Sequence, residues 1–298
     1  MIELTVKKDG FAGEFCEGTK YPDVVIIRVG GSGAAKERVI ASGQFLIDAG
    51  YSVLFLGYYL WEDQTDIISE IPVDYVEKAI AWLKEKTNNP NLKIGMTGIS
   101  QGAQYTLLAS SLIPDITSIA LASPFDHVME GNTSLFKGTG HSSFTWHGTE
   151  LRYSEWKLLR TNTLKLLLRI LKDKDYGLSR MMRYGYDKNG ADESSRIQVE
   201  KMHSHVLLLA SKNDDCWPAD EAVPRVVNRL KQVDYPYTVE SYIYQKGCHN
   251  MGGNMDIDSK QGRKLQKLMR SWSDHPEDCR KCIEDSKIRI LDFFRKTL

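Results

Sequence analysis

Several features of membrane, nucleic-acid-binding and secreted proteins are missing from this 298-residue sequence. No run approaches the roughly 20 apolar residues that a helix needs to cross a bilayer. Residues 1–20 contain no apolar stretch of the kind found in a secretory signal. The 39 Lys and Arg residues are balanced by 39 Asp and Glu residues, so the sequence lacks the basic excess of a nucleic-acid or anionic-membrane binder. We therefore expect neither a membrane nor a nucleic acid as partner.

Cysteine is also scarce. The five cysteines are odd in number and scattered, at Cys16, Cys216, Cys248, Cys279 and Cys282. This usage is typical of a reduced cytosolic protein rather than of a disulfide-stabilised secreted domain. Cys279 and Cys282 form a single C-x-x-C pair, and without a second pair zinc binding is not expected. The sequence predicts a cytoplasmic protein with no metal and no organic cofactor.

What the sequence does contain is an alternation of short apolar runs and longer amphipathic ones, without internal repeats. This alternation is typical of an α/β protein whose mostly parallel sheet is covered by helices on both faces. Strands are expected at residues 23–29, 51–57, 92–98, 116–122, 205–210 and 237–244, and helices at 34–48, 72–86, 103–112 and 276–296. The length and the 42% apolar fraction suffice for one core, so we predict a single domain over residues 1–298.

One long interval interrupts this alternation. About 80 residues separate the strands expected at 116–122 and 205–210, which is too long for an ordinary connection between strand and helix. Within the interval, residues 149–172 place leucines at helical spacing. We predict a helical cap at about residues 124–200, inserted into the domain over one end of the sheet.

The strongest chemical signal is Gly98-Ile99-Ser100-Gln101-Gly102, which fits the G-x-S-x-G nucleophile elbow. A predicted strand precedes it and a predicted apolar helix follows it, as the elbow requires. The glycines are needed because the turn is too tight for side chains beside the serine. Backbone N–H groups and the helix dipole then favour negative charge at the serine. Ser100 is the expected nucleophile.

The order of residues along the chain selects the base. In an elbow-containing hydrolase the acid and then the histidine follow the serine. Of seven histidines, His249 and His275 come late enough, and His249 lies in a glycine-flanked loop directly after the strand expected at 237–244. His275 lies in a polar stretch before the last helix, where a surface position is the better interpretation. We predict His249 as the general base.

Two adjacent carboxylates, Asp214 and Asp215, follow the strand expected at 205–210. One of them should orient the imidazole and stabilise its charged form. The alternative is an Asx turn and a helix N-cap before Ala219, a role that suits Asp215. We assign Asp214 as the catalytic acid and keep Asp215 as the alternative.

The loop Gly30-Gly31-Ser32-Gly33 lacks the Lys-Ser/Thr ending of a phosphate loop and the spacing of a dinucleotide fingerprint. It could be a plain turn. In an α/β hydrolase the loop after this strand supplies one oxyanion donor, and the residue after the nucleophile supplies the other. We predict the backbone N–H groups of Gln101 and Ser32 as the donors, with Gly31 as the alternative to Ser32.

Other polar pairs receive a structural interpretation. His203 and His205 lie on one face of a strand start, and a metal site there would need further ligands from elsewhere. Cys216 and Cys248 flank the predicted acid and base. A redox role is one interpretation of the two cysteines, but the better one is that they act as small buried apolar residues.

Taken together, these residues resemble the C-terminal hydrolase domain shared by acyl-CoA thioesterases and bile acid-CoA:amino acid N-acyltransferases, within the dienelactone-hydrolase-like group of α/β hydrolases. The resemblance implies Ser100, Asp214 and His249 as the triad and an acyl-CoA-type thioester as substrate. Members that transfer the acyl group to an amino acid tend to carry Cys at the position of Ser100, so serine implies transfer to water. The matching segments are Gly30-Gly31, Tyr58-Tyr59, 72–77, 98–102, 197–202, 213–218 and 244–249.

The sequence therefore predicts a serine hydrolase with a small-molecule acyl thioester or ester as substrate. The leading interpretation is an acyl-CoA thioesterase that works through an acyl-enzyme intermediate. A carboxylesterase or a serine peptidase of the same fold is the alternative, because the elbow and triad do not distinguish these substrates. A hydrolase-like binding protein is disfavoured by the complete set of Ser, Asp and His.

Overall fold

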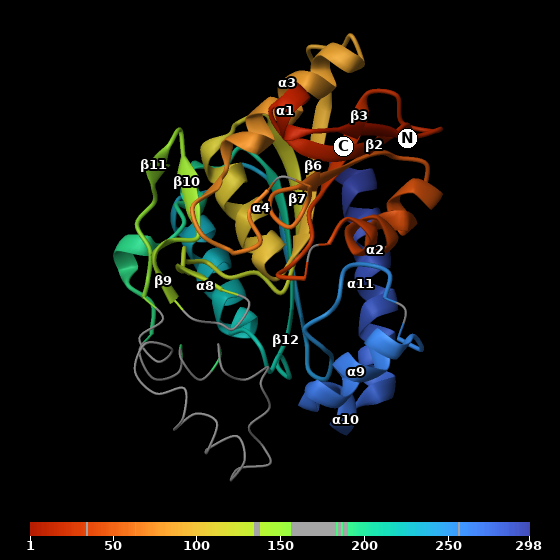
Figure 1. Ribbon diagram of the computed structural model, residues 1–298. Helices are drawn as coiled ribbons and strands as arrows, with labels where there is room; N and C mark the ends of the chain where they lie inside the picture. Colours follow the sequence, from red (N-terminus) through yellow and green to blue (C-terminus); the bar gives the residue numbers. More distant parts are fainter. Residues whose placement is uncertain are drawn as a thin grey trace.

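The computed structural model describes residues 1–33, 35–62, 64–133, 138–155, 183, 186, 190–255 and 257–298. Its centre is an eight-stranded sheet in the order β1-β2-β4-β3-β6-β7-β12-β13 (Figure 1). β2 runs antiparallel to its neighbours β1 and β4, and the strands from β4 to β13 are mutually parallel. This mostly parallel sheet with helices on both faces is the α/β-hydrolase fold, so the predicted fold class is confirmed.

The parallel part of the sheet comes from the apolar runs of the sequence. Buried parallel strands are near-continuous in hydrophobic residues because helices cover both faces, and β3, β4 and β12 are buried along nearly their whole length. All six parallel strands end at the same edge of the sheet, so the loops that follow them meet there. Their bounds are β3 (Val24–Arg28), β4 (Ser52–Gly57), β6 (Lys93–Ile99), β7 (Ile116–Ala122), β12 (His205–Ser211) and β13 (Val239–Tyr244).

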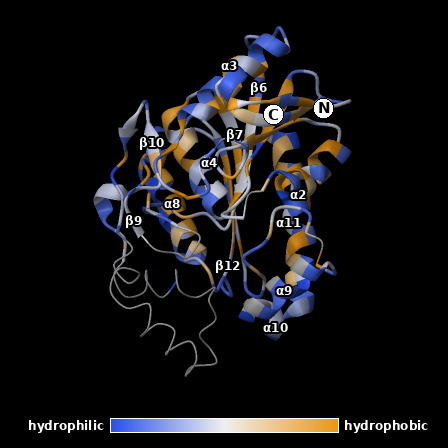
Figure 2. Cartoon of the chain, viewed as in Figure 1, coloured by the Kyte–Doolittle hydropathy of each residue, from blue (hydrophilic) through white to orange (hydrophobic). Residues whose placement is uncertain are grey.

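Helices cover the two faces of the sheet. α2 (Lys36–Asp48) and α11 (Pro276–Thr297) lie on one face, and α3 (Asp74–Lys86), α4 (Gln101–Leu112) and α8 (Ala219–Gln232) lie on the other (Figure 1). Figure 2 shows that hydrophobic residues concentrate in the central strands between these two layers. The shorter helices of the described residues are α1 (Val6–Asp9), α9 (Lys260–Leu268) and α10 (Arg270–Asp274). No described helix is long and apolar enough to cross a membrane.

The sheet begins earlier in the chain than the sequence indicates. β1 (Ile2–Leu4) and β2 (Ala12–Cys16) form an antiparallel pair at one edge, ahead of the first strand predicted from the sequence. Phe11 and Phe15 pack edge-on against Trp82 of α3, with ring centroids 6.5 and 5.6 Å apart. Because β1 and β2 are short and interrupted by charged residues, no apolar run marks them in the sequence.

The segment predicted as a helical cap contains strands in its described part. These are β8 (Glu130–Asn132), β9 (Gly138–Ser142), β10 (Phe144–Trp146) and β11 (Thr149–Glu150), followed by the 3₁₀ helices η1 (Glu193–Ser195) and η2 (Val199–Lys201). The helix expected over residues 149–172 does not begin at Thr149, which pairs with Trp146 in a hairpin. Its continuation beyond residue 155 lies outside the described residues.

The hairpin of β10 and β11 is anchored to the main body just before α3. β10 pairs in parallel with β5 (Ile71–Pro72), where Thr145 lies opposite Pro72. As a result α3 begins at Asp74, two residues later than the sequence predicts. The pattern of the sequence does not show this boundary, because the partner strand lies some 70 residues further along the chain.

Candidate active site

Ser100 lies at the sharp turn between β6 and α4. Its backbone has φ 54° and ψ −122°, a left-handed region that costs a non-glycine residue about 1–3 kcal/mol. The turn is held by the Ser100 N–H, which donates to the carbonyl oxygen of Ala122 at the end of β7, 2.9 Å away. A strained serine between strand and helix, half-buried at the carboxyl edge of the sheet, has the backbone geometry of a nucleophile elbow.

Glycines permit close backbone contacts around this turn. A Cβ atom added to Gly98 would lie 2.3 Å from the carbonyl oxygen of Gly102, and one added to Gly102 would lie 2.1 Å from that of Gly30. Both distances are far below any contact that a real Cβ makes. The second contact brings the start of α4 against the loop that follows β3.

The loop of residues 30–33 therefore lies beside Ser100. A Cβ atom on Gly31 would be 3.4 Å from the Cβ of Ser100. The hydroxyl of Tyr58 donates to the Gly30 carbonyl at 2.9 Å, and that of Tyr59 donates to the Gly31 carbonyl at 3.3 Å. In a planar trans peptide the N–H points away from the C=O, so these bonds set the directions of the Gly31 and Ser32 N–H groups.

The two tyrosines are buried donors. Tyr58 and Tyr59 are 1% and 2% exposed, and the ring of Tyr58 stacks on Tyr105 of α4 at 4.7 Å between centroids. Burial raises the pKa of Tyr58 well above its usual value, which keeps its hydroxyl protonated and able to donate. The N–H groups of Ser32 and of its alternative Gly31 thus both belong to peptides whose carbonyl accepts a tyrosine hydroxyl, and Gln101 occupies the first position of α4.

His249 and Asp214 lie within hydrogen-bond distance. The Nδ1 atom of His249 is 2.9 and 2.8 Å from the two carboxylate oxygens of Asp214, and both residues are buried. The Asp214 carboxylate also accepts the backbone N–H groups of Cys216 and Trp217, at 3.0 and 3.1 Å. Two fixed N–H donors hold this carboxylate in an orientation that faces the imidazole.

Asp215, the alternative acid, faces another part of the chain. Its carboxylate accepts the backbone N–H of Arg270 at 2.6 Å and the hydroxyl of Ser271 at 3.4 Å, at the start of α10. It does not cap α8, whose N-cap residue is Pro218 without a side-chain hydrogen bond. The expected cap role at Ala219 is therefore wrong, although Asp215 does serve a helix terminus elsewhere.

The environment of His249 favours its protonated form. Burial lowers the pKa of His249, but the charge and hydrogen bond of Asp214, together with the charge of Asp215, outweigh burial and raise it above its usual value. An imidazole oriented at Nδ1 by a buried carboxylate presents Nε2 as the free basic nitrogen. This arrangement is suited to accepting a proton and stabilising the resulting imidazolium.

The loop that carries His249 is fixed at three points. The hydroxyl of Ser123 donates to the His249 carbonyl at 2.9 Å, and Gly252 donates its N–H to Ser286 at 2.8 Å. Arg28, at the end of β3, donates from Nη1 to the Gly252 carbonyl at 2.9 Å. Burial lowers the pKa of Arg28 to about 10, so its guanidinium is still charged at neutral pH. Arg28 is not among the residues predicted from the sequence, because nothing in a strand-ending arginine signals this role.

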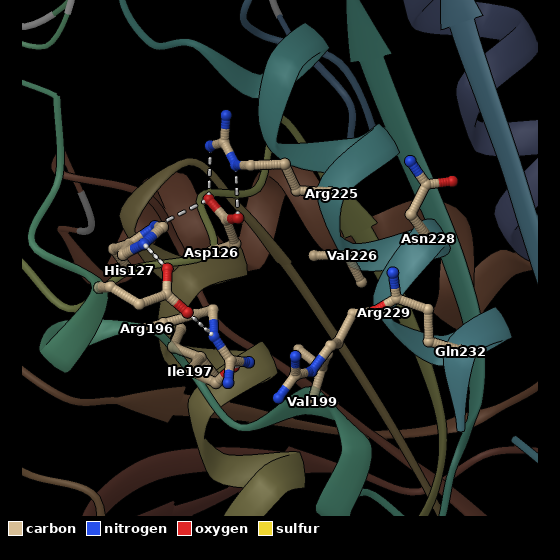
Figure 3. Close-up of a pocket in the computed structure, with 11 residues that line it drawn as sticks. Asp126, His127, Arg196, Ile197, Val199, Arg225, Val226, Asn228, Arg229 and Gln232 are labelled. Atoms are coloured by element: carbon tan, nitrogen blue, oxygen red, sulfur yellow. Dashed lines mark hydrogen bonds and ion pairs between the residues drawn. The ribbon is translucent and has the colours of Figure 1, made fainter.

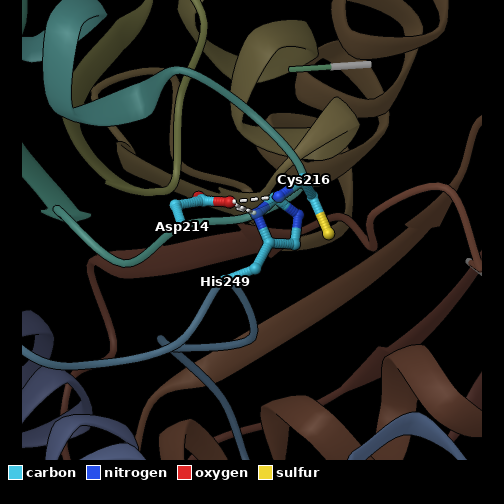
Figure 4. A group of neighbouring side chains, drawn as sticks. All are labelled: Asp214, Cys216 and His249. Carbon is cyan, nitrogen blue, oxygen red and sulfur yellow. Dashed lines mark hydrogen bonds and ion pairs between the residues drawn. The ribbon is translucent and has the colours of Figure 1, made fainter. Parts of the chain in front are cut away.

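Cys216 lies next to the pair of Asp214 and His249. The ligand-type atoms of the three side chains are all within 4.8 Å of one another (Figure 4). Burial, with the charges of Asp214 and Asp215, raises the pKa of the Cys216 thiol well above its usual value. Cys248 instead packs with Cys279 of α11 in a separate buried cluster, against which Cys216 also lies. Cys216 thus lies between the candidate acid and base on one side and the cluster that contains Cys248 on the other.

The remaining histidine candidates lie elsewhere. His275 occupies the junction between α10 and α11 and is half-buried. His203 is near the hydroxyl of Tyr237, and His205 accepts the N–H of Thr238 at 3.1 Å. Among the described residues, no metal-compatible group contains His203, His205 or the C-x-x-C cysteines of α11.

A polar cavity that the sequence analysis missed lies between α8 and the insertion, with a volume of about 240 Å³ (Figure 3). Asp126 is buried in its wall and binds Arg225 through two hydrogen bonds of 2.8 and 2.7 Å. The Nδ1 atom of His127 lies 3.1 Å from the same carboxylate. The side-chain amide of Gln104 donates to the His127 carbonyl and thereby connects this wall to the helix that starts at the elbow. Residues 125–127 lack any motif spacing, so only the fold shows this link.

Comparison with known proteins places the chain in a family. A family model described as BAAT / Acyl-CoA thioester hydrolase C terminal matches residues 71–298. Human acyl-coenzyme A thioesterase 1 is 23% identical over 211 residues, which are 71% of this chain and 44% of that protein. The mouse peroxisomal succinyl-coenzyme A thioesterase is 23% identical over 213 residues, with the same coverage of 71% and 44%. The chain thus matches less than half the length of these relatives.

Solved structures show the same fold at lower identity. An esterase from Pyrococcus furiosus superposes with a TM-score of 0.51 at 15% identity, over 100% of this chain and 95% of that one. A protein of unknown function from Staphylococcus aureus superposes with a TM-score of 0.52 at 17% identity, over 100% and 99% of the two chains. At these identities the likeness establishes the fold alone.

The close contact at Gly102 leads to a stability prediction. In Gly102→Ala the added methyl group would meet the Gly30 carbonyl oxygen at 2.1 Å, and a backbone atom cannot move aside as a flexible side chain can. We expect the free energy of unfolding to fall by about 1–3 kcal/mol, measured by urea denaturation. Gly33→Ala is the control, because its added Cβ meets only the end of the Arg38 side chain, at 3.3 Å. Equal stability of the two variants would contradict the proposed contact.

Proposed function

The chain belongs to the BAAT / acyl-CoA thioester hydrolase C-terminal family, and from this premise we propose that it is a serine hydrolase that cleaves acyl thioesters. The proposal assigns Ser100 as nucleophile, His249 as general base and Asp214 as the acid that orients the base. The observation that carries it is the buried pair of His249 and Asp214, at the same edge of the sheet as the strained turn of Ser100. A base and an acid at the same sheet edge as such a turn are suited to nucleophilic acyl transfer.

The proposed reaction has two half-reactions. In the first, His249 accepts the hydroxyl proton of Ser100 while the serine oxygen attacks the acyl carbonyl. The thiol leaves with a proton from His249, and the acyl group remains as an ester of Ser100. In the second, His249 takes a proton from water, and the resulting attack releases the acid and restores Ser100. No cofactor enters either half-reaction.

The proposed oxyanion site consists of the backbone N–H groups of Gln101 and Ser32. The negative oxygen that forms in each half-reaction needs donors already in place, because an oriented donor costs no reorganisation at the moment of reaction. The Tyr59 hydroxyl holds the peptide that carries the Ser32 N–H, and the Tyr58 hydroxyl holds the preceding one. We propose that the two tyrosines position the donors from behind the loop.

The substrate class rests on the family and on the residue at the turn. The relatives in the comparison are named as acyl-coenzyme A and succinyl-coenzyme A thioesterases. A serine nucleophile suits release of the acyl group to water. We further propose one domain over residues 1–298, with the insertion at about 124–200 shaping the acyl pocket and excluding water from it, and a cytoplasmic location.

The first prediction from the proposed function concerns substrate choice. We expect the protein to hydrolyse acyl-CoA thioesters faster than matched p-nitrophenyl esters, with little action on aminoacyl anilides. In Ser100→Ala the turnover should fall by at least about 10³-fold, since the nucleophile is lost. Hydrolysis is measured by release of free thiol, p-nitrophenol or aniline.

The control is Ser273→Ala, a change at an exposed serine of α10. Cleavage of esters but not of CoA thioesters would agree with Ser100 as nucleophile but contradict the proposed substrate class. The protein would then be a carboxylesterase. Cleavage of anilides as the best substrates would indicate a peptidase. Full activity in Ser100→Ala would overturn the mechanism.

The second prediction concerns the tyrosines behind the oxyanion loop. Tyr58→Phe and Tyr59→Phe each remove one hydroxyl from a loop carbonyl, so the loop N–H groups lose part of their fixed direction. We expect kcat to fall about tenfold with KM nearly unchanged, less than the 10²–10³ typical of losing an oxyanion donor itself. Tyr242→Phe, on an exposed ring, is the matched control. A change in KM alone would assign the tyrosines to substrate binding instead.

The third prediction concerns pH. The base must be neutral to accept a proton, and the surroundings of His249 raise its pKa. Activity should therefore rise with pH through a midpoint above the usual value of about 6.5. In Asp214→Asn the attraction is lost while burial remains, so the midpoint should fall and kcat should drop by about 10³–10⁴-fold.

The measurement is kcat/KM against pH, which reports the free enzyme. Asp215→Asn is the matched control, because the charge of Asp215 is the smallest of the contributions to the pKa of His249. Its midpoint should move less than that of Asp214→Asn. The same midpoint in Asp214→Asn as in the unmodified protein would exclude Asp214 as the partner of the base.

A further inference from the structure

A thiol lies beside the proposed acid and base and has no part in the proposed mechanism. Cys216 is two residues after Asp214, and its backbone N–H already binds that carboxylate at 3.0 Å. Its sulfur, an imidazole nitrogen of His249 and a carboxylate oxygen of Asp214 are all within 4.8 Å of one another. In Figure 4 the sulfur lies on the side of the imidazole ring that faces away from Asp214. Cys216 as a residue is half-buried.

These three groups are the ligand types that Zn²⁺ and its soft relatives prefer. Zinc binds thiolate sulfur at about 2.3 Å, imidazole nitrogen at about 2.0–2.1 Å and carboxylate oxygen at about 2.0–2.2 Å. A tetrahedral ion with these bond lengths needs its ligand atoms roughly 3.4–3.6 Å apart. Small side-chain rotations bring atoms within 4.8 Å to this spacing.

The second coordination shell is also present. The ligands of a stable metal site are themselves held by hydrogen bonds. The Asp214 carboxylate is fixed by two backbone N–H groups, and the loop of His249 is fixed by Ser123 and Arg28. The same bonds that position the acid and base would position two of the three ligands.

We propose that Cys216, His249 and Asp214 form an inhibitory binding site for a thiophilic divalent cation of the Zn²⁺ class. Binding displaces the thiol proton to solvent and forms bonds from the cation to the sulfur, one imidazole nitrogen and one carboxylate oxygen. No oxidation or reduction is involved. The inhibitory consequence rests on the proposed function, whereas the binding itself does not.

Coordination of the cation by either ring nitrogen of His249 leads to the same loss of activity. If the cation occupies Nε2, that nitrogen cannot accept the proton of Ser100. If the cation occupies Nδ1, the neutral imidazole carries its proton on Nε2 and again has no lone pair there. A bound cation and a working base therefore exclude each other, and the inhibition is reversible when the cation leaves.

A second group of possible ligands in the described part of the chain provides an internal comparison. Asp74 and Glu77 of α3 lie near His147, again within 4.8 Å of one another. This group contains no sulfur and is exposed at His147. A soft cation bound there would give no thiolate signal, so the two groups can be told apart spectroscopically.

The experiment uses CdCl₂ as the probe, because Cd²⁺ bound to thiolate gives a charge-transfer absorption in the ultraviolet. Titration of the reduced, chelator-treated protein should produce this band with one Cd²⁺ per chain. Saturating CdCl₂ should reduce hydrolysis at least tenfold, and EDTA should restore it. Cys216→Ser should lose the band of this site and require at least tenfold more Cd²⁺ for the same fractional inhibition.

Three variants keep the test specific. His249→Ala should weaken Cd²⁺ binding at least tenfold, because a chelate loses a ligand, whereas a lone thiol would be unaffected. Cys248→Ser should keep both the band and the inhibition, since Cys248 belongs to a separate cluster. His147→Ala should also keep both.

Binding can also be separated from the proposed function. Ser100→Ala should keep the band, so the site remains testable even if no thioester or ester is hydrolysed. A band and an inhibition profile that are the same in Cys216→Ser and the unmodified protein would overturn the proposal. Loss of the band in Cys248→Ser alone would move the site to the cluster around α11 and overturn it equally.

Discussion

The proposed active site depends on one backbone contact, between the start of α4 and the loop after β3. No side chain fits between Gly102 and the Gly30 carbonyl, so two segments that are about 70 residues apart in the sequence touch directly. This contact brings the turn of Ser100 alongside the N–H groups of the loop. The Tyr58 and Tyr59 hydroxyls then fix the loop from its other side. Close backbone packing, rather than any charged side chain, thus brings the proposed nucleophile and the proposed oxyanion donors together.

Ala122, the last residue of β7, and Ser123, the residue after it, connect the proposed nucleophile to the proposed base. The Ala122 carbonyl accepts the N–H of Ser100, and the hydroxyl of Ser123 donates to the carbonyl of His249. Adjacent positions of one strand end therefore hold both loops. Arg28 fixes the same base loop from β3. Burial of a charged guanidinium is costly. Replacing Arg28 would remove both the hydrogen bond to the Gly252 carbonyl and a charge beneath the loop.

The parts of the fold and of the candidate site that the sequence predicts are those whose determinants lie close together in the chain. The parallel strands and their helices could be predicted from the sequence, because burial on both faces of the sheet makes continuous apolar runs. Asp214 and His249 could be paired from chain order, but separating Asp214 from Asp215 required knowing that α10 lies beside the second carboxylate. β1 and β2 could not be predicted from the sequence, since charged residues interrupt their apolar positions. The helix predicted to begin at Thr149 is wrong at that residue, because Thr149 pairs with Trp146 in a β-hairpin whatever the helical spacing of the leucines that follow.

The thiol of Cys216 adds a ligand to an arrangement that already resembles half of a metal site. A general base needs an imidazole with one nitrogen fixed by a carboxylate and the other free, and a metal-binding histidine needs the same. What separates the two is whether a further ligand lies within reach. The backbone N–H of Cys216 serves Asp214 whatever its side chain, so positioning of the acid does not require cysteine here. Any small residue would keep that bond, and only a cysteine also offers sulfur to the space beside His249.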